Sequence, residues 1–147
     1  MLTVAGYTLD PALRYEPATN VWVADLGDGR VRVGLDPLGA ETSGDIVAVS
    51  FAASGAALAA GEAMAIIEAA KFVGPLAAPV PGRLAAVNPA VIDAPGQINA
   101  DPYGAWLAEL DGVPADRLAA LVGGEAAITA WFADAVARFR AEGAIAQ

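Results

Sequence analysis

Two short strand-like runs with one lysine between them constrain the fold of this chain more than any other feature. Residues 63–68 and 73–78 are largely apolar, and Lys71 lies in the few residues that separate them. Residues 79–82, Pro-Val-Pro-Gly, end the second run at a corner. Apolar runs of this length joined by so short a segment are typical of a β-hairpin. The sequence therefore predicts a hairpin with Lys71 at its tip.

Lys71 differs chemically from every other basic residue of the chain, because the remaining seven are all arginine. A guanidinium group stays protonated, whereas a primary amine can lose its proton and be acylated. A single lysine on an otherwise uncharged turn therefore predicts a covalent attachment point. The alternative, from these residues alone, is an ordinary solvated lysine in a turn.

The rest of the first 112 residues also indicates β structure. Strands are expected at residues 21–26, 30–35, 45–51, 82–87 and 106–110. Residues 27–29, Gly-Asp-Gly, predict a tight turn between the first two strands, because these residue types tolerate a positive φ. Residues 36–42 predict a short helical turn, and residues 55–61 and 88–103 predict loops. Trp22 is expected to pack into the core.

The last part of the chain indicates helices. Residues 116–122 predict one or two turns, the glycines at 123 and 124 interrupt them, and a longer helix is expected at residues 125–142. Five residues of that helix recur on one apolar face: Ile128, Trp131, Phe132, Ala135 and Phe139. We therefore expect a β domain at residues 1–112, with the helices of residues 113–147 packed on it.

The composition excludes several classes of protein. The chain has neither histidine nor cysteine, which removes His/Cys zinc sites, disulfides and nucleophiles activated by histidine. A formal net charge of −9 argues against nucleic acid or an anionic membrane as a partner, because both favour basic surfaces. We find no signal peptide and no spanning segment. We expect a cytoplasmic monomer with no metal and no catalytic residue of its own.

Three pairs of stretches match, in order, the motifs of one known family. The matching residues are 33–36 with 44–47, 68–71 with 78–82, and 99–104 with Trp106. They read Val-Gly-Leu-Asp with Gly-Asp-Ile-Val, Glu-Ala-Ala-Lys with Ala-Pro-Val-Pro-Gly, and Asn-Ala-Asp-Pro-Tyr-Gly with Trp. The family's segments are "VGIT…LGDIV", "ESVK…APVSG" and "NSDPYG…W". The chain therefore resembles the H protein of the glycine cleavage system, within the wider biotinyl/lipoyl carrier superfamily.

The resemblance implies a mainly β fold: a flattened β-barrel of the barrel-sandwich hybrid type, with a C-terminal helical segment. It also implies that Lys71 carries lipoate through an amide bond, with Glu68, Ala70 and Phe72 as flanking residues. A lipoate ligase or lipoyl transferase would attach the group. The protein would then be a carrier rather than an enzyme, whose lipoyl-lysine arm swings between partner enzymes.

Two departures from the family pattern bear on the pathway. Val21 stands where the family usually has glutamate, and residues 72–75, Phe-Val-Gly-Pro, replace a small polar flank. That flank is similar to the H-protein-like lipoate-binding proteins of sulfur-oxidising systems. We therefore expect, with a slight preference, a role in sulfur oxidation with a heterodisulfide-reductase-like complex as partner.

Three alternatives remain open. The first is the glycine cleavage H protein itself, carrying the aminomethyl group between the enzymes of that system. The second is a biotinyl carrier, but such carriers usually have methionines beside the lysine, where Ala70 and Phe72 stand here. The third, of a different class, is an unmodified interaction module that kept the fold and lost the chemistry.

Overall fold

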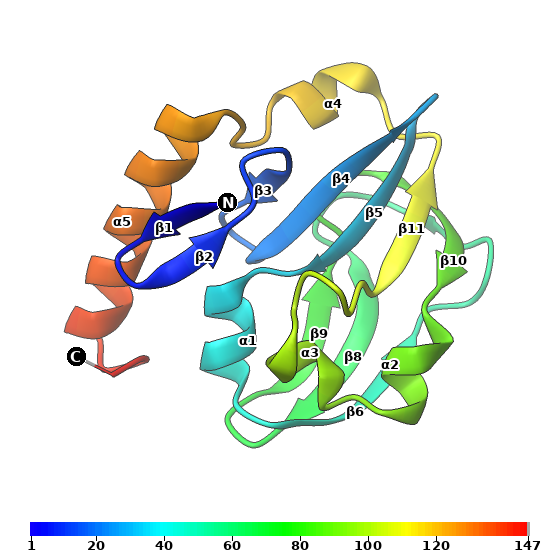
Figure 1. Cartoon of the computed structure of the whole chain (residues 1–147). Coiled ribbons are helices and arrows are strands. Elements are labelled where there is room, and N and C mark those ends of the chain that lie inside the picture. Colours follow the sequence, from blue (N-terminus) through cyan, green and yellow to red (C-terminus); the bar gives the residue numbers. More distant parts are fainter. Residues whose placement is uncertain (147) are drawn as a thin grey trace.

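The strands of this mainly β protein fall into two sheets and one additional hairpin, β1–β2 (Figure 1). The computed structural model describes residues 1–146. The larger sheet has the order β3-β4-β5-β11-β10-β7, and the smaller has the order β6-β8-β9. The strands are β1 Leu2–Val4, β2 Tyr7–Leu9, β3 Arg14–Glu16, β4 Val21–Gly27, β5 Arg30–Leu35, β6 Ile46–Phe51, β7 Ala57–Leu58, β8 Ala63–Ala69, β9 Val73–Ala77, β10 Gly82–Val87 and β11 Ala108–Asp111. The helices are α1 Pro37–Ser43, α2 Pro89–Asp93, α3 Gln97–Ala100, α4 Ala115–Ala119 and α5 Glu125–Ala141.

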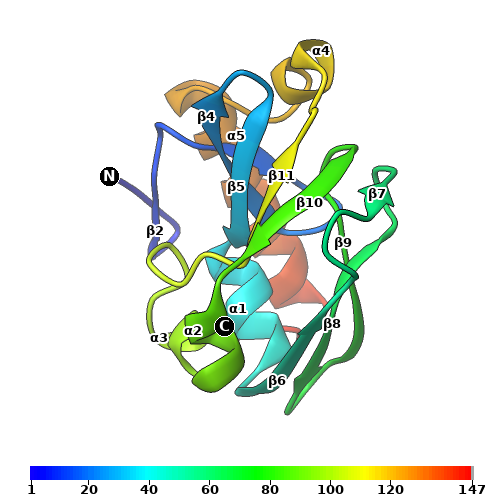
Figure 2. The same cartoon turned by 90° about the vertical axis from the view of Figure 1, so that its right-hand side faces the viewer.

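The two sheets lie face to face over one apolar core (Figure 2). Val33 and Leu84 of the larger sheet and Met64 and Ile67 of the smaller sheet are all buried in this core. Within residues 1–146, no strand pairing closes the two sheets into a single cylinder. The predicted fold class, mainly β with a C-terminal helical segment, is confirmed, and its barrel-sandwich character takes the form of two stacked sheets.

The β4–β5 hairpin forms at the predicted turn, where residues 27–29 have φ values of 90°, 55° and 76°. Trp22 of β4 is buried, as expected. Its indole lies against Gly34 of β5, where an added Cβ would come within 2.4 Å of the ring. The indole Nε1 donates to the carbonyl of Pro102 at 3.0 Å. Gly34 is therefore the residue that leaves room for the tryptophan.

Helix α5 and the N-terminal hairpin enclose a second apolar cluster, on the outer side of β4 (Figure 1). The predicted face of the helix packs as expected: Ile128, Phe132 and Ala135 are buried, and Trp131 and Phe139 are partly buried. Helices α4 and α5 lie in the predicted helical segment 113–147, whose last residue, Gln147, is outside the described part. Neither α5 nor any other helix within residues 1–146 has the length and hydropathy needed to cross a membrane.

Three parts of the chain differ from the sequence-based expectation. The predicted loop at residues 88–103 contains α2 and α3, which are only five and four residues long, too short to show a helical period. Asn88 caps α2 by accepting from the N–H of Ala90 at 3.1 Å. The predicted loop at residues 55–61 contains the two-residue strand β7. Strands β1–β3 were not predicted, because three residues each are too few to show alternation.

Candidate functional site

Lys71 lies at the tip of the β8–β9 hairpin, as the sequence predicts. Strand pairing ends where Glu68 faces Val73. The turn is then closed by the N–H of Ala69, which donates to the carbonyl of Phe72 at 2.9 Å. The side chain of Lys71 is exposed. The hairpin therefore presents a primary amine to the solvent.

The structure brings all three predicted flanking residues to the same tip. Glu68, Ala70 and Phe72 are exposed. Phe72 is 41% exposed and Val73 is 71% exposed. The ring of Phe72 lies over Gly74, where an added Cβ would come within 3.3 Å of the ring. The tip thus combines an amine, one carboxylate and an uncovered apolar surface.

The backbone of the tip rests on the segment that connects α1 to β6. The N–H of Ala70 donates to the carbonyl of Asp45 at 3.0 Å, and the N–H of Lys71 donates to the carbonyl of Ser43 at 2.9 Å. Gly44, between these two carbonyls, has a φ of 72°. An added Cβ on Gly44 would come within 3.1 Å of Cγ of Lys71. The backbone of the tip is therefore held in place while the lysine side chain projects from it.

A hollow of about 340 Å³ lies beside Lys71. The segment before β4, helix α1 and the β8–β9 hairpin form its walls. Its lining residues are Ala18, Thr19, Asn20, Leu35, Gly39, Thr42, Ser43, Ile67, Lys71, Phe72, Pro75, Leu76 and Ala77. Lys71 is the one charged residue in this lining, and the polar groups are hydroxyls and one amide. The hollow is thus suited to an uncharged, largely aliphatic group.

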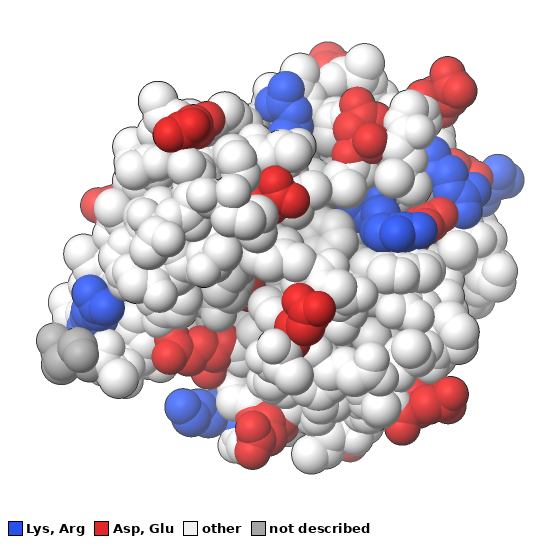
Figure 3. All heavy atoms as spheres, in the orientation of Figure 1, with Lys and Arg blue, Asp and Glu red and all other residues white. Residues whose placement is uncertain are grey.

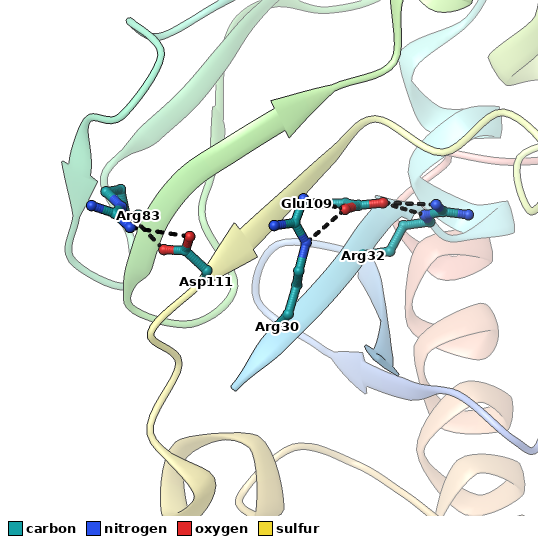
Figure 4. A network of polar contacts seen from close by, with 5 residues as sticks. All are labelled: Arg30, Arg32, Arg83, Glu109 and Asp111. Carbon is teal, nitrogen blue, oxygen red and sulfur yellow. Dashed lines mark hydrogen bonds and ion pairs between the residues drawn. The ribbon is translucent and has the colours of Figure 1, made fainter. Parts of the chain in front are cut away.

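Three arginines gather on a different face, the outer side of the larger sheet, where β5, β11 and β10 lie side by side (Figure 3). Arg30 and Arg32 each lie 2.7 Å from the carboxylate of Glu109, and Arg83 lies 3.1 Å from that of Asp111 (Figure 4). Burial acts to raise the pKa of Glu109, but hydrogen bonds from the two arginines outweigh it and hold that pKa below its usual range. These charges pair with one another across neighbouring strands, so we assign them to the scaffold.

The reactive group at the tip is the amine itself. Within residues 1–146, no group of three or more acidic, histidine or cysteine residues is placed to hold a metal ion. The exposed amine of Lys71 is accessible to an acylating enzyme, and a hollow lies beside it.

Comparison with known proteins gives the family. The sequence model described as glycine cleavage H-protein matches residues 13–131. The chain belongs to the glycine cleavage H-protein family. The H protein of Mycobacterium avium (strain 104) is 42% identical over 123 residues, which cover 83% of this chain and 88% of that protein. The H protein of Aromatoleum aromaticum is 40% identical over 101 residues, which cover 69% and 79% of the two chains. The solved structure of an H protein from Mycobacterium marinum aligns with a TM-score of 0.64 at 36% identity, covering 70% of this chain and 85% of that one.

Membership of the H-protein family confirms the predicted resemblance and the prediction of a carrier rather than an enzyme. Proteins of this family carry lipoate covalently on a lysine. These comparisons give no support to the preference for sulfur oxidation with heterodisulfide-reductase-like partners, because the relatives named here are glycine cleavage H proteins. The attachment of lipoate at Lys71, and the flanking roles of Glu68, Ala70 and Phe72, stay predictions.

Sequence reasoning missed two features of the site. Residues 43–45 are predicted only as the junction between a helical turn and a strand, and their contact with Lys71 leaves no local sequence signal. Val21, which stands where H proteins usually have glutamate, is one of the two departures expected to bear on the pathway. In the structure Val21 is fully buried in the core between the sheets and is absent from the lining of the hollow.

Proposed function

We propose that this protein carries lipoate on Nζ of Lys71 and serves as the shuttle of the glycine cleavage system. The observation that supports the proposal most directly is the position of Lys71. The only lysine of the chain stands exposed at a hairpin tip whose backbone is held by two hydrogen bonds. A lysine needed only for its charge could be replaced by arginine, the basic residue used everywhere else in this sequence.

The residues around Lys71 fit a lipoyl group. Leu35, Ile67, Phe72 and Leu76 give the hollow an apolar lining beside the lysine. Acylation would form an amide between Nζ and the carboxyl carbon of an activated lipoyl donor, with loss of a proton from the amine and departure of the donor's leaving group. The attached group would then supply reactive sulfurs that the cysteine-free chain lacks.

The exposed tip also fits the partners expected for a carrier. Phe72 and Val73 offer an apolar contact next to the lysine, and Glu68 offers a single carboxylate. These groups would be covered by the lipoate ligase or lipoyl transferase during attachment, and later by the enzymes that use the arm. The protein itself would position the lysine, which is open to solvent. The catalytic groups would belong to those partner enzymes.

Glycine cleavage is the pathway we propose, because the relatives are H proteins of that system. One observation favours the second candidate, sulfur oxidation. The hollow beside Lys71 has no carboxylate among its lining residues. A cationic aminomethyl cargo would gain little from such a setting, whereas a neutral sulfur cargo would tolerate it.

The attachment is tested by producing the protein together with a lipoate ligase and mapping the product by peptide mass spectrometry. We expect one lipoyl group, on Lys71. A Lys71→Arg variant keeps the charge and should stay unmodified at every position. Efficient lipoylation of that variant would refute the assignment.

The pathway is tested by reconstituted glycine decarboxylation, with this lipoylated protein and a standard H protein at equal concentration. Rates within a few-fold of one another support glycine cleavage. A rate near that of the assay without any carrier, from fully lipoylated protein, would instead favour sulfur oxidation.

A further inference from the structure

The segment at residues 99–104 matched a family motif in the sequence, and the proposed function leaves it without a role. Its first residue, Asn99, contacts both sides of the connection between α1 and β6. The side-chain Oδ1 of Asn99 accepts from the N–H of Ile46 at 2.9 Å. Its Nδ2 donates to the carbonyl of Gly44 at 2.8 Å and to that of Ala40 at 3.3 Å. One amide therefore holds the end of α1 and the start of β6 together.

The same short connection holds the tip that carries Lys71. The carbonyls of Ser43 and Asp45 accept from the N–H groups of Lys71 and Ala70. The carbonyl of Gly44, between them, accepts from Asn99. Residues 43–45 are thus bonded through consecutive carbonyls to the tip on one side and to Asn99 on the other.

The segment that contains Asn99 is itself hydrogen-bonded to other parts of the molecule. Two residues of the same segment bond to distant parts of the molecule: the carbonyl of Pro102 accepts from Trp22 at 3.0 Å, and the hydroxyl of Tyr103 donates to the carbonyl of Thr8 at 3.1 Å. The indole of Trp22 is buried. The segment that carries Asn99 is therefore hydrogen-bonded both to the larger sheet and to the N-terminal hairpin.

The position requires an amide. It needs an acceptor for one N–H and two donor hydrogens for two carbonyls, and only asparagine and glutamine carry this combination on one planar group. Aspartate would keep the acceptor and lose the donor. We infer that Asn99 is a positioning residue for Lys71, which fixes the backbone of the lysine through residues 43–45. The consequence for lipoylation rests on the proposed function.

The test compares Asn99→Ala with Asn88→Ala. Asn88 is the control, because its side-chain amide likewise donates to a backbone carbonyl, that of Trp106 at 2.9 Å, and accepts from a backbone N–H, that of Ala90. Asn88 is buried and Asn99 is partly buried. The first readout is amide hydrogen exchange of the unmodified chain, followed by NMR. We expect Asn99→Ala to speed the exchange of the Lys71 and Ala70 N–H groups about ten-fold, the effect of losing roughly one hydrogen bond. We expect Asn88→Ala to leave them unchanged.

The second readout is steady-state lipoylation by a lipoate ligase, with the chain as the varied substrate. If the tip populates its competent arrangement less often, the apparent affinity falls by that fraction while the bound chain reacts normally. We therefore expect Asn99→Ala to raise KM with kcat nearly unchanged, at a temperature where both variants are folded. A merely structural loss would affect both variants alike.

Unchanged exchange at Lys71 and Ala70 in Asn99→Ala, or equal acceleration in both variants, overturns the inference. If Asn99→Ala does not fold, Asn99→Asp replaces it, and this variant should show faster exchange at the same two N–H groups. If the wild-type chain is not acylated at Lys71, the proposed function fails, and the exchange measurement still decides the role of Asn99.

Discussion

Two single residues differ sharply in their surroundings: Phe72, at the tip of the β8–β9 hairpin, and Asp36, at the start of helix α1. Phe72 is partly exposed beside Lys71, whereas Asp36 is fully buried at the start of α1. One carboxylate oxygen of Asp36 accepts from the N–H of Gly39 at 2.8 Å, and the other has no hydrogen-bond partner among residues 1–146. Burial raises the pKa of this carboxyl to about 7. Helix α1 is therefore capped by a carboxyl group whose pKa is raised by burial.

Phe72→Ala should weaken turnover with partner enzymes while lowering the free energy of unfolding by less than about 1.5 kcal/mol, because a partly exposed ring leaves little cavity. Phe132→Ala is the matched control, since the same side chain is fully buried there. That variant should lose about 3–5 kcal/mol. Chemical denaturation gives the free energy of unfolding, and a lipoylation assay gives the turnover with one partner enzyme, the lipoate ligase. A loss for Phe72→Ala as large as that for Phe132→Ala would show that Phe72 belongs to the core.

Asp36→Asn should change how stability depends on pH. The folded pKa of about 7 lies above the ordinary value of 3.8, so the folded state binds more protons between these values. The stabilisation linked to this proton is complete below about pH 4 and is lost as the pH rises through about 7. The amide does not titrate and still offers its oxygen to Gly39. Denaturant titrations should therefore show the wild type losing stability relative to the variant across this window, and parallel curves would contradict the prediction.

At the scale of elements, the hairpin that carries Lys71 depends on a helix and a connection that precede it in the chain. Helix α1 ends at Ser43 and is capped by Gly44, whose positive φ turns the chain toward β6. The same residue lies against the lysine side chain, and an added Cβ there would press on Cγ of Lys71 at 3.1 Å. One glycine therefore serves both as the helix terminus and as the contact surface of the tip.

Gly44→Ala should reduce the rate of lipoylation at Lys71. Gly55→Ala separates this effect from backbone strain, because Gly55 also has a positive φ, 80°, but an added Cβ there would meet nothing within 4 Å. Both variants should lose stability through the disfavoured φ. Only Gly44→Ala should displace the tip, as measured by kcat/KM for lipoylation. Equal rates in the two variants would show that the close contact has no effect on presentation.

At the scale of the whole molecule, the larger sheet separates two apolar clusters. One lies between the sheets, and the other lies under α5 and the N-terminal hairpin. Tyr15 and Val122 exchange backbone hydrogen bonds of 2.9 and 3.0 Å, which join the start of the chain to the segment before α5. We therefore propose that residues 113–146 form one folding unit with the β domain.

The sequence predicts the hairpin, its lysine and the apolar face of α5, because each is encoded by neighbouring residues. Alternation and helical period are local patterns, and a single lysine can be counted. The contacts that hold the tip are not encoded by neighbouring residues. Asn99 and Ile46 are 53 positions apart, and the carbonyls of Ser43 and Asp45 are backbone groups that every residue type possesses. The hollow beside Lys71 likewise needs three separate segments, so no single stretch of sequence indicates it.

The anchored tip has a kinetic consequence for the arm proposed at Lys71. Because the Lys71 backbone is bonded to residues 43–45, the arm would pivot from a fixed origin rather than from a moving loop. The volume that its far end searches is then set by the lysine side chain and the attached group alone. A smaller search volume means a higher local concentration of the reactive end in the cleft of a docked enzyme. Loosening the tip would dilute that end without altering a single contact in the enzyme.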